Sequence, residues 1–223
     1  MAGPMPAYIG WGSLTAIPAE RMVSLAVRSL KLAGMRGVIL GGWAGLSLEK
    51  LAKQPESEEL VAYAKKNVLF VQTAAHEWLF PQCSVIVHHG GAGTTAAALR
   101  SGRPTVVIPC GLDQFANGRL VERCGAGFML TRLKNLSPEE LAYAIDVCRN
   151  DEEMREHCLY IGRQLQREDG IGATVKELDR FFSEEVATGS WAKRSKERQA
   201  SLAMLAKPSF FKRLGLFCSF MCR

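Results

Sequence analysis

The 223-residue sequence has no long apolar run and no CxxC pair of cysteines. No segment reaches the roughly 18 apolar residues that a membrane-spanning helix needs, and residues 1–6 lack the basic start and apolar core of a secretory signal. The seven cysteines are scattered, odd in number and without a CxxC pair, which indicates reduced thiols. We therefore expect a cytoplasmic protein.

Charge is unevenly distributed along the chain. The net charge is +6, but residues 184–223 contain eight Lys and Arg against three Glu, so most of the excess lies in a tail. The 48% apolar and 22% charged composition is typical of a globular protein. We predict one domain over residues 1–182, followed by a basic, partly aromatic tail over residues 183–223.

Short apolar runs alternate with helical patterns throughout the predicted domain. This order predicts an α/β fold, a Rossmann-like doubly wound parallel sheet of about six strands. The strands are expected near residues 7–11, 38–40, 68–71, 85–87, 105–109 and 127–130. Because ligands of such sheets bind outside the carboxyl ends of the strands, the turns after these runs are the places to look for a site.

The most informative turn follows the run at residues 85–87. It reads His88-His89-Gly90-Gly91-Ala92-Gly93-Thr94-Thr95 and leads into an alanine-rich helical segment. Glycines allow a ligand to approach the backbone closely, and the first N–H groups of a helix attract anions. We expect a diphosphate here, with His89 donating to it. His88, pointing to the opposite face of the strand, is expected to be structural.

A carboxylate and a carboxamide, Asp113 and Gln114, follow the next predicted strand. Such a pair can accept hydrogen bonds from the vicinal hydroxyls of a sugar and donate to them. Asp113 could instead cap the helix that it begins, and Ser13, after the first strand, could be only a turn residue.

Several of these stretches together resemble a known family. The segments HHGGAGTT and GRPTVVIP, the Asp113-Gln114 pair, YIGWGS at residues 8–13 and HEWLFPQ at residues 76–82 resemble the C-terminal, donor-binding domain of UDP-sugar-dependent glycosyltransferases of the GT-B fold. Among these, the sterol 3-beta-glucosyltransferases are most similar. Residues 170–182 resemble the closing helix, so the resemblance covers roughly residues 7–182.

The resemblance implies roles for particular residues. The UDP diphosphate would be bound by Ser13, His89, Gly91, Gly93 and Thr94, and the sugar by Asp113 and Gln114. The uracil and ribose would lie near Val71, Gln72, Ala74 and His76. Val71 stands where the plant enzymes have a tryptophan, so base recognition would depend on apolar contacts and backbone amides.

The activity implied is transfer of glucose from UDP-glucose to a sterol or other lipid hydroxyl with inversion, without a cofactor. No DxD-like motif lies near the donor site, so we expect no metal. In the family, the general base and the acceptor pocket belong to an N-terminal domain that is absent here, so no catalytic residue is assigned. The alternative is a non-catalytic nucleotide-sugar binding module, or a subunit that requires a separate acceptor domain, in cis or in trans.

Two further interpretations concern other ligands. Residues 91–96 fit the dinucleotide fingerprint G-x-G-x-x-A, but they follow the fourth predicted strand instead of the first, which disfavours a nicotinamide enzyme. The tail mixes cations and aromatics at residues 191–198 and 210–217. It is interpreted either as a solvated extension or as a peripheral membrane contact near the lipid acceptor. Nothing indicates nucleic-acid binding.

Overall fold

The computed structural model describes residues 3–15, 17–55 and 57–205. The chain divides into two compact units, Met1–Arg167 and Glu168–Arg223. The strands of the first unit are β1 (Ala7–Gly10), β2 (Gly37–Leu40), β3 (Val68–Val71), β4 (Val85–His88), β5 (Thr105–Val107) and β6 (Gly127–Met129). Its helices are α1 (Ala19–Leu32), α2 (Leu48–Ala52), α3 (Glu58–Asn67), α4 (His76–Leu79), η1 (Phe80–Gln82), α5 (Ala92–Arg100), α6 (Gln114–Arg123), α7 (Pro138–Asn150) and α8 (Glu152–Arg167).

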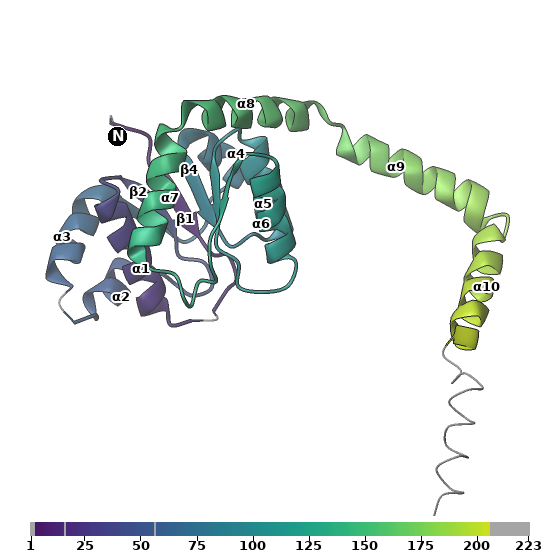
Figure 1. Ribbon diagram of the computed structural model, residues 1–223, viewed down its shortest axis with the longest axis horizontal. Coiled ribbons are helices and arrows are strands. Elements are labelled where there is room, and N and C mark those ends of the chain that lie inside the picture. Colours follow the sequence, from purple (N-terminus) through teal and green to yellow (C-terminus); the bar gives the residue numbers. More distant parts are fainter. Residues whose placement is uncertain (1–2, 16, 56, 206–223) are drawn as a thin grey trace, which may run out of the picture. The chain divides into compact units, whose positions relative to one another are not determined.

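The six strands form one parallel sheet, with helices on both sides of it (Figure 1). Their order, β3-β2-β1-β4-β5-β6, is that of a dinucleotide-binding Rossmann sheet, and the direction of winding reverses between β1 and β4. Gly10 of β1 pairs with His88 of β4, so the loops that follow these two strands leave the sheet side by side. The predicted fold class is confirmed.

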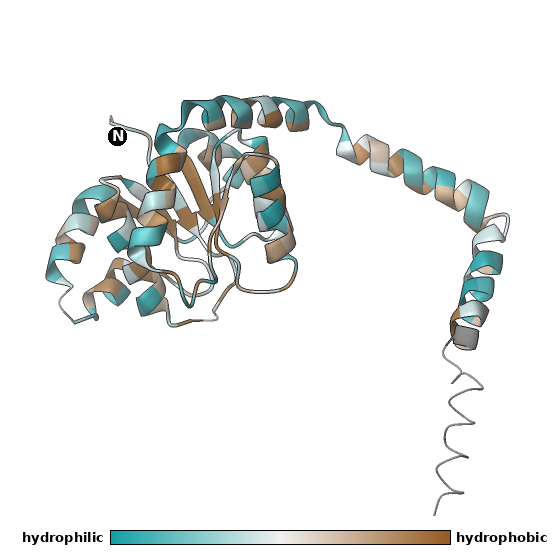
Figure 2. Ribbon diagram, in the orientation of Figure 1, coloured by the Kyte–Doolittle hydropathy of each residue, from teal (hydrophilic) through white to brown (hydrophobic). Residues whose placement is uncertain are grey.

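Alternate strand residues pack on opposite faces of the sheet, as the twofold strand period requires. On one face, Ile9, Ile39 and Val87 form the main core with residues of α1 and α7. On the other, Tyr8 and Ile86 pack against the α4–η1 segment and α5. The central strands are accordingly the most apolar part of the unit (Figure 2).

Helix starts in this unit follow local sequence signals. Ser137 caps α7: its Oγ accepts from the Glu140 amide (3.2 Å), and the Glu140 carboxylate accepts from the Ser137 amide (2.9 Å). Pro138 occupies the first turn, where no N–H donor is needed. The sequence therefore fixes the start of the helix that covers the main core.

The second unit consists, over its described residues, of helical segments α9 (Gly170–Arg180), η2 (Phe181–Val186) and α10 (Ser190–Leu205). Neither α9 nor η2 contains a buried residue. The second unit begins at Glu168, and the domain boundary predicted at residue 182 stays a prediction. None of the described helices combines the length and hydropathy needed to cross a membrane.

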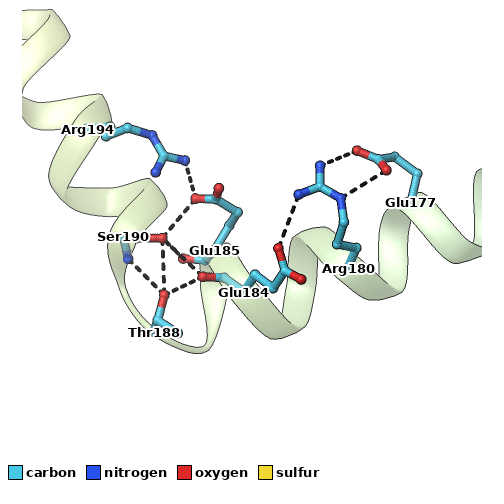
Figure 3. Close-up of polar contacts among 7 residues, drawn as sticks. All are labelled: Glu177, Arg180, Glu184, Glu185, Thr188, Ser190 and Arg194. Carbon is cyan, nitrogen blue, oxygen red and sulfur yellow. Dashed lines mark hydrogen bonds and ion pairs between the residues drawn. The ribbon is translucent and has the colours of Figure 1, made fainter.

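Polar contacts connect neighbouring turns of this unit (Figure 3). Arg180 pairs with Glu177 and, at 3.2 Å, with Glu184. After the turn, Ser190 Oγ donates to the Glu185 carboxylate (2.8 Å), which also pairs with Arg194. These contacts are all local in sequence and exposed or partly exposed.

Candidate functional site

The turn between β4 and α5, residues 89–91, and the first residues of α5, 92–94, form an elbow at the reversal point of the sheet. Gly90 has a φ of +88°, and a Cβ atom there would lie 2.9 Å from the carbonyl oxygen of Gln114, so this position favours glycine. The helix begins without a side-chain cap. The amides of Gly93 and Thr94 have no hydrogen-bond acceptor among the described residues. Together with the helix dipole, these free N–H groups make the elbow suitable for an anion.

His89 packs inside this elbow. Cβ atoms placed on Gly91 and Gly12 would lie 2.5 Å from His89 Nε2 and 3.0 Å from its Cε1, so the imidazole occupies the space that two glycines leave open. Its Nδ1 is buried and has no partner among the described residues. Burial lowers the pKa of His89; Asp113 opposes this shift and His76 adds to it. The ring is therefore neutral at pH 7 and offers one N–H donor.

His88 has a different role from its neighbour. It is fully buried, and its Nδ1 accepts a hydrogen bond from the Gly90 amide (2.9 Å). Burial, with smaller contributions from His89 and His76, lowers the pKa of His88 to about 3. The neutral ring fixes the first bend of the elbow, in agreement with the structural role expected from its place on the strand.

The Asp113-Gln114 pair lies in the loop after β5. Gln114 is buried, and its Oε1 accepts from the amides of Cys110 (2.7 Å) and Gly111 (3.1 Å). The carboxamide oxygen thus shapes the loop, and sugar binding through its amide nitrogen stays a prediction. Asp113 is exposed and makes no side-chain cap to α6, so the capping alternative is not realised. Leu112 has a φ of +54° and is 93% exposed.

Asn117 joins this loop to the elbow, a contact that the sequence did not predict. Its Nδ2 donates to the Gly90 carbonyl (2.8 Å) and to the Asp113 carboxylate (3.1 Å). The two contacts bring the predicted sugar-binding and diphosphate-binding segments together. The only sequence signal is the spacing of four residues from Asp113, which places the two side chains on one face of α6.

The other predicted residues lie after β1 and β3. Ser13 is exposed in the turn that follows β1. Gln72 lies beside Gly41, where an added Cβ atom would be 3.1 Å from Gln72 Oε1. Val71 and Ala74 are partly buried against the apolar cluster that contains Tyr8 and Ile86. These segments follow the carboxyl ends of the strands, as predicted; their contacts with a nucleotide stay a prediction.

His76 is turned into the protein. It stacks on Phe80, with ring centroids 4.5 Å apart, and its Nε2 lies 3.2 Å from the hydroxyl of Tyr8. Burial lowers the pKa of His76 and raises that of Tyr8, so both are neutral at pH 7. A direct contact of this imidazole with uracil or ribose would compete with the Tyr8 contact.

Among the described residues, no group of three or more His, Cys, Asp or Glu side chains is arranged so that it could hold a metal ion. The metal-independent reaction implied by the resemblance stays a prediction. The dinucleotide fingerprint follows β4 instead of β1, as its position in the sequence indicated.

Residues 41–168 match the family described as "Erythromycin biosynthesis protein CIII-like, C-terminal domain". The chain belongs to this family. Relatives of this EryCIII-like domain include the sterol 3-beta-glucosyltransferase UGT80B1 of Arabidopsis thaliana, 31% identical over 220 residues, which are 99% of this chain and 34% of the relative. A sterol 3-beta-glucosyltransferase of Saccharomyces cerevisiae is 34% identical over 77% of this chain and 14% of its own. The chain thus spans about a third or less of these relatives.

Solved structures show the same fold. Os79 of O. sativa in complex with UDP aligns with a TM-score of 0.65 and 19% identity over 82% of this chain and 41% of its own. A UDP-glucose:anthocyanidin 3-O-glucosyltransferase in complex with UDP aligns with a TM-score of 0.61 and 17% identity over 74% and 36%. The EryCIII-like domain therefore has the architecture of the C-terminal half of a GT-B glycosyltransferase, as the sequence motifs implied.

Proposed function

We propose that this domain binds the diphosphate of a UDP-sugar at the elbow and, with an acceptor-binding half, transfers glucose from UDP-glucose to the hydroxyl of a sterol or other lipid. The observation that carries the proposal is the combination of unsatisfied Gly93 and Thr94 amides with the enclosed His89 imidazole at the reversal point of the sheet. The similarity to sterol 3-beta-glucosyltransferases supports the choice of donor and acceptor.

The proposed reaction is a displacement with inversion at the anomeric carbon. The acceptor oxygen forms the new bond to that carbon, the bond to the UDP oxygen breaks, and the hydroxyl proton passes to a general base. As UDP leaves, negative charge grows on its β-phosphate. The amides at the start of α5 and the His89 N–H would stabilise this charge without rearranging, because they are already held in place.

The remaining predicted residues would orient the donor. The exposed carboxylate of Asp113 can accept from sugar hydroxyls, and the amide nitrogen of Gln114 can donate to one. Ser13 would add a hydroxyl donor to the diphosphate from the loop after β1. Val71, Gln72, Ala74 and His76 would lie on the nucleoside side.

The acceptor site and general base are proposed to lie in a separate half, in cis or in trans. The alternative, a non-catalytic nucleotide-sugar binding module, has the same donor site and differs only in turnover. Glucosyltransfer to a sterol should be measured with and without an acceptor half. UDP binding without transfer in both conditions would eliminate the enzyme interpretation for this chain.

We also propose a cytoplasmic location with peripheral membrane contact through the tail. All five cysteines in the described part of the chain are unpaired, and α10 contains the cations Lys193, Arg194, Lys196 and Arg198. Residues 210–217 lie outside the described residues. Deleting residues 190–223 should abolish binding to anionic vesicles; unchanged binding would reject the membrane contact.

Donor binding is tested most simply by replacing His89. His89→Ala removes the imidazole donor and should weaken UDP binding by about tenfold or more, the usual effect of losing a hydrogen bond to a charged group. Isothermal titration calorimetry would measure the affinity. The exposed His157 provides the control, because His157→Ala should leave UDP binding unchanged. Equal affinities of wild type and His89→Ala would contradict the assignment of this imidazole.

A further inference from the structure

A cavity lies at the amino ends of the strands, the edge of the sheet opposite the elbow. Its volume is about 600 Å³, within the roughly 300–1,000 Å³ usual for small-molecule sites. The segment before β1, the first residues of β2 and β3, the end of α3 and the α4–η1 segment line it. We call this cavity the basal groove; no residue proposed to bind the donor lines it.

The interior of the basal groove is apolar. Val38 and Leu69 are paired across β2 and β3, and both contribute to the lining together with Leu79 and Met5. Leu69 is 48% exposed although it lies in a strand of the sheet. Its side chain thus gives the groove an apolar surface that the protein itself leaves partly uncovered.

The polar part of the groove is cationic. Arg36, Lys65 and Lys66 contribute to the lining, and the described lining residues include no Asp or Glu. The two lysines occupy the last turn of α3, where cations also stabilise the helix carbonyls. Arg36 adds a third cation to the lining from the segment that precedes β2. The charge pattern is complementary to an anion.

The wall formed by residues 4–6 is held in place by hydrogen bonds. The Ser84 amide donates to the Pro6 carbonyl (2.8 Å), and the Ala7 amide donates to the Arg36 carbonyl (2.9 Å). Ser84 Oγ lies 3.3 Å from the Met5 carbonyl, to which it donates. The groove is therefore formed before any ligand arrives, which reduces the entropic cost of binding.

We propose that the basal groove binds a single-chain anionic amphiphile. The alkyl chain would lie on Val38, Leu69 and Leu79, and the phosphate or carboxylate head would lie among the three cations. A neutral amphiphile would satisfy only the apolar half, and a free anion only the charged half. The proposal does not depend on donor binding, because the two sites lie at opposite edges of the sheet.

Calorimetric titration of the full chain with monododecyl phosphate, below its micellar concentration, tests the charged half. Lys65→Gln/Lys66→Gln should weaken binding by about tenfold, as expected for two partly exposed ion pairs. Lys53→Gln/Lys134→Gln removes the same charge at two exposed lysines that do not line the groove and should leave binding unchanged. Inorganic phosphate and dodecyl maltoside, which has the same chain on a neutral head, should each bind more weakly than monododecyl phosphate.

The apolar half is tested by comparing alkyl phosphates of eight, ten and twelve carbons. Affinity should rise with chain length in the wild type and rise less steeply in Leu69→Ser. The amide NMR shifts caused by the alkyl phosphate should be confined to residues of the groove, and saturating UDP should not change them. Equal weakening by the two lysine pairs, equal affinity for dodecyl maltoside, or displacement by UDP would overturn the proposal. Circular dichroism confirms that each exposed substitution leaves the fold intact.

Discussion

The sheet-containing unit and the helical segment over residues 168–205 are stabilised by different interactions. In the first, apolar side chains such as Ile39 and Leu30 are fully buried, and loops distant in sequence meet at the elbow. In the second, α9 buries no residue and leaves Ile171, Val175 and Leu178 exposed, while its polar contacts are local. A binding site with hydrogen-bond donors in fixed positions needs the support of a packed apolar core. We therefore assign the donor site to the sheet-containing unit.

The largest contrast should come from removing apolar side chains. Ile39→Ala should lower the free energy of unfolding by about 2–5 kcal/mol, because it leaves a cavity in the core. Val175→Ala, at an exposed helical position, should change it by less than about 0.5 kcal/mol. Urea unfolding followed by far-UV circular dichroism measures both. Similar losses of unfolding free energy in the two variants would mean that the apolar residues of α9 are buried in solution.

Glycine substitutions sharpen the same contrast. Gly90→Ala places a Cβ atom 2.8 Å from Val107 and 2.9 Å from the Gln114 carbonyl, at a φ of +88°. We expect a loss of about 2–3 kcal/mol, since strain and overpacking each cost roughly 1–3 kcal/mol. Gly170→Ala meets no atom within 4 Å and should be neutral or slightly stabilising. Thermal melts of the two variants measure the difference, and an undisturbed Gly90→Ala protein would contradict the elbow geometry.

Acid should destabilise the first unit through His88. Its pKa is about 3 in the folded state and 6.5 ordinarily, so below pH 6.5 the unfolded chain binds a proton that the folded chain does not. The free energy of unfolding should therefore fall with decreasing pH, by at most about 1.4 kcal/mol per pH unit from this group. His88→Asn should reduce that slope between pH 6.5 and 5. An unchanged slope in His88→Asn would refute a neutral buried imidazole.

The smallest effect is expected in the exposed ion pairs of the second unit. Glu184→Gln removes one partner of Arg180 (3.2 Å) and should reduce helix stability by roughly 0.3–0.5 kcal/mol. The exposed Glu168, which lies outside the contacts drawn in Figure 3, supplies the control substitution Glu168→Gln. The difference in helicity between low and high salt should be smaller in Glu184→Gln than in the control. A loss of several kcal/mol would contradict a purely local role.

Local sequence patterns predicted the sheet and the elbow because both depend on neighbouring residues. Buried runs such as residues 85–87 specify strands, and Gly90 and Gly91 specify the turn. Hydrogen bonds between side chains and segments far apart in the sequence could not be predicted from such local patterns. His76 pairs with Tyr8, 68 positions away, and Asn117 reaches Gly90, 27 positions away.

Two other features depend on energetic balances that a pattern does not reveal. The periodicity of α9 resembles that of a core helix, yet whether its stripe is covered depends on the surfaces available to it. Gln114 matches a sugar-binding position, yet its Oε1 also satisfies the amides of Cys110 and Gly111, which otherwise would be left without partners in a partly buried loop.

A crystal structure of the chain with UDP tests the central claim most directly. The β-phosphate oxygens should lie within about 3.2 Å of the Gly93 and Thr94 amides, at hydrogen-bonding distance, with a His89 ring nitrogen contacting the same phosphate. A diphosphate bound away from residues 89–94, with these amides still unoccupied, would contradict the assignment of the elbow as the donor site.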